Sequence, residues 1–381
     1  KQGQVRTGAR TKFLAEFPVF DLDSELSFGA ELSREWYDLS IYENLYQDFP
    51  GSGSVRGVIL SNNTQNRSYY NIFAQWNLEF SEKWNLEAGI NYNSTSYELS
   101  DLYVSDGTDQ SGAYEFPSVF SPRLGLTYDI SNSKIFYASV SHGFSIPTVA
   151  QTLTPEGMIN TALQPETGIN YEAGFKGSWL GNKLYSEIAI YTVQVENLLV
   201  AERVAEDRYI GRNAGETDHS GIELLLNYNI RFNEDIRAKI YANAAFNFFK
   251  FDRFIDDGIN YSGNLIPGVP DNTITGGIDL MIGSGFKFSA FHQYVGEIPL
   301  NDANSIYAEE YRLLNLKTSY SFDLFEGINL KIFGGLNNVL DEKYAASILP
   351  NAVGFGGSDP RYYYPGKPLN YFLGIELGFD F

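Results

Sequence analysis

Two short stretches of the sequence carry side chains suited to binding an anionic or aromatic ligand. The stretch "AERVAEDRYIGRNAG" supplies arginines and a tyrosine, and "DPRYYYPGK" supplies an arginine followed by three tyrosines. The candidate ligand-binding residues are Arg203, Arg208, Tyr209, Arg212, Arg361, Tyr362, Tyr363 and Tyr364. Planar guanidinium groups pair with carboxylate or catecholate oxygens, and aromatic rings take up other rings and cations. Because the two stretches are far apart in the sequence, the fold must bring them together.

No other group of residues forms a recognisable catalytic or metal-binding pattern. The glycine-rich stretch "GSGSVRG" at 51–57 loosely resembles a phosphate-binding loop, but it lies between two expected strands with no helix to follow. His142, His219 and His292 fall on three different expected hairpins, so a histidine metal site would require a coincidental convergence. We therefore predict no catalytic residue, no metal site and no cofactor held by the chain.

Composition excludes several classes of protein. The formal net charge of -20 argues against nucleic acid as a partner, because binding to phosphates needs clustered Lys and Arg. The chain has no Cys, which excludes a disulfide framework and thiolate metal sites. No apolar stretch approaches the roughly 20 residues of a membrane-spanning helix. The sequence starts at Lys1 without an initiating Met, so we expect a processed or truncated product.

The sequence alternates between apolar and polar residues in many places. In the terminal stretch "LNYFLGIELGFDF", apolar residues at 373, 375, 377, 379 and 381 are separated by small or acidic ones. Residues 70–80 and 84–93 show the same period of two, which indicates strands with two different faces. We count about fifteen strand candidates of the length that a tilted strand needs to cross a bilayer.

Short and long links between these strands alternate along the chain. The short links are 81–83, 130–134, 180–183, 232–235, 282–285 and 323–327. The long links include 48–67, 100–116, 144–166, 200–218, 253–268 and 345–368. This alternation is typical of an outer-membrane barrel, with periplasmic turns and extracellular loops. A soluble sandwich or propeller remains the alternative, although its links need not alternate in length.

Five segments in this order resemble the TonB-dependent outer-membrane receptors of the ferric-siderophore type. They are "TPEGMINTALQPETGINYEAGFKGSW", "GRNAGETDHSGIELLLNY", "NLIPGVPDNT", "FGGLNNVLDEKYA" and "YYYPGKPLNYFLGIELGF". The resemblance implies an all-β fold, a transmembrane antiparallel β-barrel, with residues 1–381 as the C-terminal portion of the barrel domain. The chain would supply about the last 15 strands of a roughly 22-strand barrel, and the plug domain would be absent. We therefore expect a fragment.

The resemblance also implies a function and partners. It implies a receptor in the outer membrane of a Gram-negative bacterium that takes up a ferric siderophore or similar iron chelate, with the iron carried by the chelate. Implied partners are the TonB–ExbB–ExbD complex, through the missing N-terminal region, outer-membrane lipid and lipopolysaccharide, and the barrel assembly machinery, for which Phe381 would be the signal. Phe381 could equally be only the last lipid-facing residue. The alternatives are a passive porin-like channel and uptake of another ligand such as a cobalamin.

Local motifs predict further structural details. Gly174 and Gly177 should leave room in the wall or the lumen, and Asn337, Asn338 and Asp341 should satisfy backbone donors where a strand gives way to a loop. We expect the long links at one rim, with the short turns and Phe381 at the other, and no pairing between the edge strands at 5–15 and 370–381. The loop arginines could instead pair with neighbouring acids or with lipopolysaccharide phosphates, and the tyrosines could belong to an aromatic girdle.

Overall fold

The computed structural model of the protein describes residues 2–45, 54–154, 158–205, 208–256, 258–354 and 357–379. Contacts divide the chain into two compact units. Unit 1 comprises Lys1–Leu126, Ser139–Asn170 and Gln194–Glu216, and unit 2 comprises Thr127–Ala138, Tyr171–Val193 and Thr217–Phe381. Within the part of the chain that the structure describes, no helix is long and apolar enough to cross a membrane.

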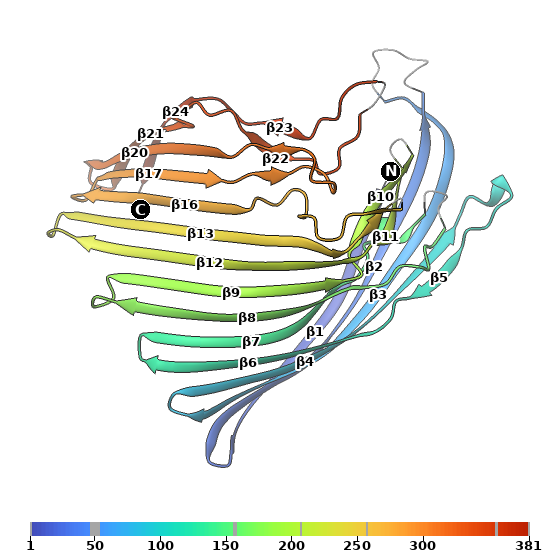
Figure 1. The fold of residues 1–381 in the computed structure, drawn as a ribbon, viewed down its shortest axis with the longest axis horizontal. Helices are drawn as coiled ribbons and strands as arrows, with labels where there is room; N and C mark the ends of the chain where they lie inside the picture. The colour runs from blue at the N-terminus through green and yellow to red at the C-terminus, as the bar shows by residue number, and fades with distance from the viewer. Residues whose placement is uncertain are drawn as a thin grey trace. The chain divides into compact units, whose positions relative to one another are not determined.

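In the described residues, fifteen long strands follow one another in hydrogen-bonded order, as the alternating sequence predicts. They are β1 (Gln2–Val19), β2 (Leu22–Asn44), β3 (Arg56–Ser81), β4 (Trp84–Asp101), β6 (Val119–Ser131), β7 (Lys134–Ser145), β8 (Glu166–Trp179), β9 (Leu184–Glu196), β12 (Glu216–Arg231), β13 (Ile236–Arg253), β16 (Asn272–Ile282), β17 (Phe286–Val295), β20 (Tyr311–Phe325), β21 (Ile328–Asn337) and β24 (Asn370–Phe379). β5 (Gly112–Glu115) adds to β4. Figure 1 shows β13, β16, β17 and β20 side by side in unit 2.

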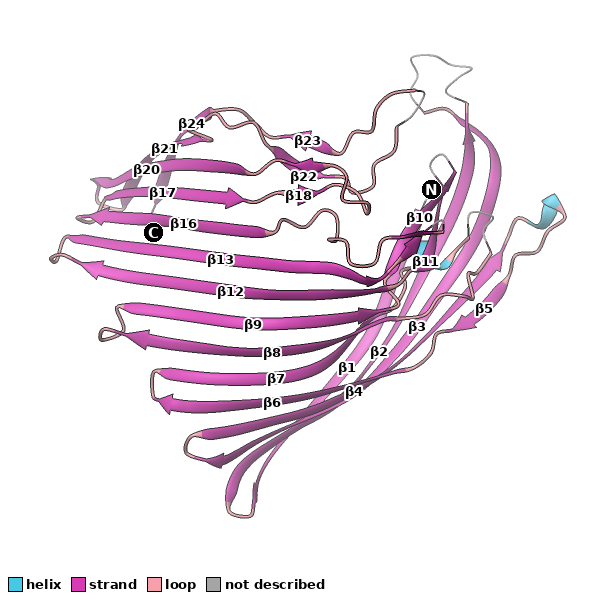
Figure 2. Cartoon of the chain, viewed as in Figure 1, coloured by secondary structure: helices cyan, strands magenta, loops and turns pink. Residues whose placement is uncertain are grey.

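The long links contain short elements that the sequence did not reveal (Figure 2). Where the structure describes these links, four of them hold two-stranded hairpins: β10 (Leu199–Ala205) with β11 (Arg208–Asn213), β14 (Ile255–Asp256) with β15 (Ile259–Asn260), β18 (Ile298–Pro299) with β19 (Tyr307–Ala308), and β22 (Ala345–Ile348) with β23 (Tyr363–Pro365). A 3₁₀ turn, η1 (Val104–Asp106), and a short helix, α1 (Val149–Thr152), complete the described elements.

The predicted alternation of links is confirmed within each unit. β1 to β4 pair antiparallel in sequence order, as do β13 to β24 along the main sheet, so short turns lie at one edge of each stretch and long links at the other. A short turn at Phe20 and Asp21 was not predicted, and the long link expected at 48–67 is shorter because β3 begins at Arg56. Phe381 lies outside the described residues, but Phe379 pairs with Ile328, beside the short turn at Gly327.

Each strand presents an apolar face and a polar face. In unit 2, Ile278 lies opposite Ile240 and Ala290, whereas its neighbour Asp279 lies opposite Lys239 and Ser289. Large apolar side chains such as Ile240 and Ile278 are exposed to the surroundings on the first face. An outward apolar band with an inward polar face is the pattern of a membrane-spanning barrel wall.

Aromatic side chains gather at two levels of the apolar face in unit 1. Tyr70, Tyr92 and Phe120 lie in succession across β3, β4 and β6, with ring centroids 6.0 and 4.7 Å apart. Phe80 stacks on Trp84 at 6.1 Å beside the short turn between β3 and β4. Two such levels separated along the strands match the girdles found at the two membrane interfaces.

β1 and β24 stand at the two ends of the hydrogen-bonded order. β1 pairs with β2, and β24 pairs with β21. β1 belongs to unit 1 and β24 to unit 2, and the absence of pairing between these two strands stays a prediction.

Glycines on the polar face make room for aromatic rings on the neighbouring strand. A Cβ added at Gly174 would lie 2.5 Å from the ring of Tyr137, and one at Gly221 or Gly277 would meet the ring of Tyr191 or Tyr241 in the same way. The predicted need for space at Gly174 is confirmed. Such rings cover the strand backbone where a side chain is missing.

The side chain of Asn338 ties together the two ends of the long link between β21 and β24. Its Nδ2 donates to the carbonyl oxygens of Glu342 and Lys367, at 2.9 and 3.1 Å, and its Oδ1 accepts from the Glu342 amide. Asp341 Oδ1 accepts from the amide of Leu369 at 2.8 Å. Asn338 and Asp341 therefore satisfy backbone groups at the strand end, as predicted from the sequence, whereas Asn337 Nδ2 donates to the side chain of Asn370 at 2.9 Å.

Apolar cores lie at the long-link ends of the strands rather than between the strands. In unit 1, Tyr97 and Leu99 of β4 pack against Phe116 and Leu163 from two long links. In unit 2 a second core is built around the hairpin β18–β19; its buried members are Val295, Ile298, Leu300 and Ala308. These cores hold the long links in defined positions above the strands.

Candidate functional site

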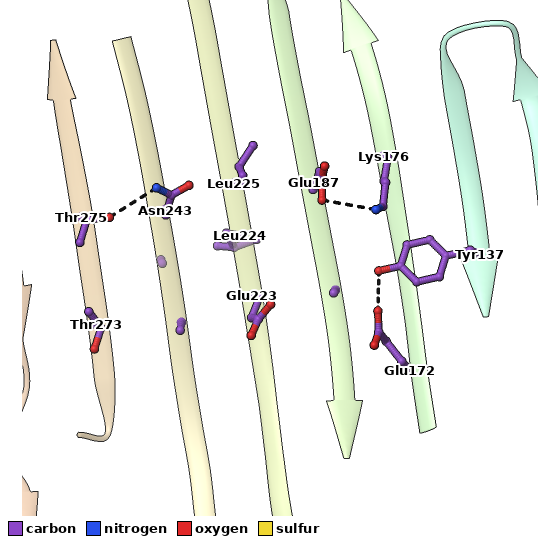
Figure 3. Close-up of a pocket in the computed structure, with 13 residues that line it drawn as sticks. Tyr137, Glu172, Lys176, Glu187, Glu223, Leu224, Leu225, Asn243, Thr273 and Thr275 are labelled. Carbon is purple, nitrogen blue, oxygen red and sulfur yellow. Dashed lines mark hydrogen bonds and ion pairs between the residues drawn. The ribbon is translucent and has the colours of Figure 1, made fainter. Parts of the chain in front are cut away.

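Polar side chains of unit 2 line a hollow of about 460 Å³ on the polar face of β7 to β16 (Figure 3). Tyr137 donates a hydrogen bond to Glu172 at 2.7 Å. Lys176 Nζ lies 3.7 Å from Glu187, and these residues come from the neighbouring strands β8 and β9. Each side chain reaches the hollow because alternate residues of a strand point to the same face.

The hollow has an excess of negative charge. It contains the carboxylates of Glu172, Glu187 and Glu223 and the single ammonium group of Lys176. Glu223 forms neither a hydrogen bond nor an ion pair with any side chain drawn in Figure 3. The hollow therefore suits a cationic group better than an anionic ligand.

Sequence reasoning did not single out Glu172 or Glu223. Both stand in alternating strands, where an acidic residue on the polar face is unremarkable in sequence. Only the cross-strand register brings Tyr137 to Glu172 and places Glu223 in the same hollow. The sequence did show that Glu172, Gly174 and Lys176 are two residues apart and therefore share one face of a strand. That spacing does not identify the residues on the neighbouring strands.

A second polar cluster lies on β1 to β3 in unit 1. Arg6 is hydrogen-bonded to Tyr69 and lies 3.5 Å from Glu35, which is 8% exposed. Tyr69 donates to Glu31 at 3.0 Å, and Tyr37 donates to Glu35 at 3.0 Å. Tyr37 is well beyond the roughly 10 residues nearest the short turn that would span a membrane. Burial, together with the hydrogen bond to Glu35, raises the pKa of the Tyr37 phenol, so it stays a donor at neutral pH.

The first predicted ligand group lies on the hairpin β10–β11 of unit 1. Arg203 pairs with Tyr209, and Arg212 pairs with Val200, in the hairpin register. Arg208 pairs with Ala205. The side chains of Arg203, Arg208 and Tyr209 lie outside the described part of the structure, whereas that of Arg212 is half-buried. The backbone of the hairpin thus places the group on one small element.

The second predicted ligand group lies on and beside β23 in unit 2. Tyr363 and Tyr364 pair with Ile348 and Ser347 and are 51% and 62% exposed. Arg361 is also exposed. Tyr362 instead packs against the core around β18–β19, so its ring supports the loop. Each group belongs to its own compact unit, and their convergence on one ligand stays a prediction.

The histidines and the glycine-rich stretch have separate local surroundings. His142 lies 3.4 Å from Ser121 Oγ, and His219 lies 2.9 Å from Thr217 and stacks on Phe249. His292 is on β17. In the described ranges no cluster of three or more His, Asp or Glu is arranged to hold a metal ion. Residues 56–57 of the glycine-rich stretch begin β3, so no phosphate-binding helix follows it.

An antiparallel strand ladder with one apolar face, aromatic girdles and links of alternating length defines the wall of an outer-membrane β-barrel. The family described as "TonB dependent receptor-like, beta-barrel" matches residues 3–339, and the chain belongs to this family. The predicted all-β fold, as the barrel part of such a receptor, is thereby confirmed.

Individual relatives are distant in sequence and similar in fold. The chain is 24% identical to the ferric-pyoverdine 358 receptor of Pseudomonas putida, over 69% of this chain and 29% of the receptor. It is 22% identical to the metal-pseudopaline receptor CntO of Pseudomonas aeruginosa, over 79% of this chain and 40% of the receptor. Among solved structures, the ferric-catecholate import receptor Fiu of E. coli K12 matches with a TM-score of 0.72 at 16% identity, over 99% of this chain and 55% of that chain. The chain therefore spans less than half the length of these two curated relatives.

Proposed function

We propose that the chain forms barrel wall in an outer-membrane receptor of a Gram-negative bacterium, and that this receptor takes up a ferric siderophore or a similar iron chelate. The observation that carries the proposal is the family match over residues 3–339. The names of the two relatives, a ferric-pyoverdine receptor and a metal-pseudopaline receptor, favour a metal chelate as the ligand. The role is transport, with no chemical conversion of the ligand.

In this proposal the loop residues recognise the ligand and the strands form the wall. Arg212, with Arg203 and Arg208 on the same hairpin, would pair with the anionic oxygens of the chelate. The exposed rings of Tyr363 and Tyr364 would stack on its aromatic groups. The iron would be carried by the chelate, so the chain needs no cofactor. Outer-membrane lipid and lipopolysaccharide would surround the apolar face.

Energy for uptake would come from the TonB–ExbB–ExbD complex. The plug and the TonB-contacting segment would belong to sequence other than residues 1–381, because this chain covers only 29% and 40% of its two curated relatives. The barrel assembly machinery would insert the strands, with Phe381 as the terminal signal. Phe381 itself is outside the described residues.

Growth on defined iron sources tests the proposal. The full-length receptor would be expressed in a strain that lacks its own siderophore receptors, with a ferric pyoverdine, ferric citrate or a ferric tris-catecholate as the only iron. We expect growth with at least one chelate, and loss of that growth when tonB is deleted. Growth that survives the deletion would indicate a passive channel. Growth with none of these chelates, from a receptor present in the outer membrane, would contradict iron uptake.

A further inference from the structure

Two long links of unit 1 are hydrogen-bonded to each other beside Arg212. Asn160, in the link between β7 and β8, donates through Nδ2 to the carbonyl oxygen of Gly211 at 2.8 Å. The Oδ1 of the same side chain accepts from the amide of Ala162 at 3.2 Å, which fixes its orientation. The residue just before Arg212 is therefore held by another link of the chain.

The residue just after Arg212 is held as well. Asn213 Oδ1 accepts from the amide of Gln164 at 2.7 Å, and its Nδ2 donates to the Gln164 carbonyl oxygen at 3.0 Å. The same Nδ2 is 2.7 Å from the carbonyl oxygen of Asn197 at the base of the hairpin. One side chain thus joins both strands of the hairpin base to the neighbouring link.

Close packing reinforces these hydrogen bonds. Gly211 is buried, and a Cβ added there would lie 2.6 Å from the carbonyl oxygen of Gln151 in α1. At the start of β10, the amide of Leu199 donates to Glu166 Oε2 at 2.9 Å. The hairpin is therefore fastened on both of its strands, and β11 has no space to shift toward α1.

The link that holds the hairpin is itself anchored to β4. Leu163 is 1% exposed and packs with Tyr97, Leu99 and Phe116. Tyr114 donates from its hydroxyl to the Leu163 carbonyl oxygen at 2.9 Å. The anchor is three residues from Asn160 in sequence, and it connects the hairpin to the strand ladder through one short segment.

We propose that Asn160 and Asn213 are positioning residues for ligand recognition. Residues 158–166 and 208–216 would form one recognition unit, in which the residues on both sides of Arg212 are hydrogen-bonded to the neighbouring link. The inference rests on the proposed function for its ligand. A guanidinium group carried by an anchored backbone binds an anionic chelate with less loss of conformational entropy than one on a mobile loop. Asn160 and Asn213 touch backbone rather than ligand, so their effect on affinity would be indirect.

The test compares two isosteric changes in the full-length receptor. Asn160→Asp keeps the bond from the Ala162 amide but places an oxygen against the Gly211 carbonyl oxygen, so the donor is lost. Asn233→Asp is the matched control, because the side-chain bonds of Asn233 to the described residues are made by its Oδ1, which accepts from the amides of Asp235 and Ile236. We expect hydrogen exchange at β11 to become about tenfold faster in Asn160→Asp and to stay unchanged in the control.

A second variant reaches the same contact by another route. Gly211→Ala would push β11, and with it the carbonyl oxygen that Asn160 contacts, away from Gln151, while the Asn160 side chain itself stays unchanged. We expect the same faster exchange at β11 in this variant. Unchanged exchange in both variants, in receptors that insert and fold normally, would overturn the proposal.

Binding of ferric citrate and a ferric tris-catecholate, followed with radioactive iron, separates positioning from stability. For a probe that the wild-type receptor binds, we expect Kd to rise about tenfold in Asn160→Asp and to stay unchanged in Asn233→Asp. Faster exchange with an unchanged Kd would overturn the positioning role. A wild-type receptor that binds neither probe would contradict the proposed function for these chelates and would remove the recognition role. Hydrogen exchange at β11 would still decide whether residues 158–166 and 208–216 are joined.

Discussion

At the scale of single residues, the polar face of unit 2 repeats one arrangement. Tyr137, Tyr191 and Tyr241 each lie over a glycine of a neighbouring strand, and a carboxylate stands two residues from each glycine; these pairs are Gly174 with Glu172, Gly221 with Glu223, and Gly277 with Asp279. The ring fills the space above the glycine while its hydroxyl can approach the acid, as Tyr137 does with Glu172. The glycine is thus required for the position of the phenol.

Replacing Gly174 with Ala should destabilise the barrel. The new Cβ would lie 2.5 Å from the Tyr137 ring, which would have to move and give up its place beside Glu172. Overpacking of this kind costs about 1–3 kcal/mol, so we expect a lower midpoint of urea unfolding for the full-length receptor in lipid vesicles. Gly143→Ala is the control, because its nearest neighbour is 4.0 Å from the added Cβ. Equal midpoints for the two variants would show that the ring moves at no cost.

Residue-scale prediction from sequence succeeded for local contacts and failed for contacts across strands. The roles of Asn338 and Asp341 were predictable because their hydrogen bonds lie at the ends of a link that the sequence itself marks with turn residues. The joining of Asn160 to Gly211 was not, because it connects two different long links. The type of a side chain does not show which residue of another link it will contact.

At the scale of elements, the strands were predictable because alternation is a property of each strand alone. Many of the long strands satisfy it, including the edge strand predicted at 5–15, which lies within β1, whereas β12 carries three consecutive leucines at 224–226. The hairpins inside the long links were missed, since two-residue strands such as those of β14–β15 and β18–β19 are too short to alternate. Their positions come from packing and from bonds between links.

The turn between β1 and β2 was missed for a different reason. Phe20 and Asp21 both have positive φ, at 52° and 64°, which is the geometry of a tight hairpin turn usually occupied by Asn and Gly. Phe20 is 94% exposed and carries no turn signal. A bulky residue at positive φ is strained, so the sequence and the backbone disagree at this position.

Phe20→Asn should therefore stabilise the hairpin. Asn tolerates positive φ far better than Phe, and we expect a gain of about 0.5–1 kcal/mol in the free energy of unfolding. Phe325→Asn is the matched control, because Phe325 is 73% exposed beside another short turn and has no positive φ. If both variants lose stability equally, contact of the aromatic ring with lipid outweighs the backbone strain.

The long links of unit 2 are hydrogen-bonded to one another in a layer, and the stability of this layer should depend on pH. Asn304 exchanges two hydrogen bonds with Leu265, at 2.7 and 2.9 Å, and Asp302 is joined to Asn351 by its amide and by its Oδ1. Asp302 lies in the link between β17 and β20, outside the strands. Burial, and to a smaller extent the nearby charge of Asp256, raises the pKa of the Asp302 carboxyl above its ordinary value of 3.8.

The folded layer favours the neutral carboxyl of Asp302. The stabilisation that this group contributes is therefore fully present below pH 3.8 and is lost as the pH rises through the raised pKa of Asp302. We expect hydrogen exchange in residues 296–310, corrected for intrinsic rates, to speed up over that window. Asp302→Asn should remove the dependence, since its amide stays neutral at every pH. Asp109→Asn is the control: Asp109 belongs to a link of unit 1, and hydrogen bonds from Ser111 lower its pKa, so this change should leave the pH dependence in residues 296–310 in place. A pH profile unchanged by Asp302→Asn would assign the dependence to another group.

At the scale of the whole molecule, charge poses the problem that any anionic chelate would meet. The chain has a formal net charge of -20, and the hollow of unit 2 carries more carboxylates than cations. The general field therefore repels anions, and local cations on the long links must overcome it. Neither composition nor strand pattern could show where those cations lie relative to one another, because the two predicted groups belong to different compact units.

Replacing the loop arginines Arg203, Arg208, Arg212 and Arg361 together with Gln should weaken chelate binding and leave the barrel folded. The expected loss is at least about tenfold in affinity, since charge-assisted bonds to anionic oxygens contribute roughly 1.5–3 kcal/mol each. The strand ladder does not include these side chains, so resistance to heat in detergent should be unchanged.

The control replaces the same number of cations near the short turns, in a variant with Lys83, Lys183, Arg231 and Arg237 changed to Gln. An equal loss in both variants would assign the effect to net charge, and no loss in the loop variant would place the ligand elsewhere. A loss of affinity that is confined to the loop variant, and that becomes smaller as the salt concentration is raised, would show that the arginines of the long links attract the anionic chelate despite the negative net charge of the protein.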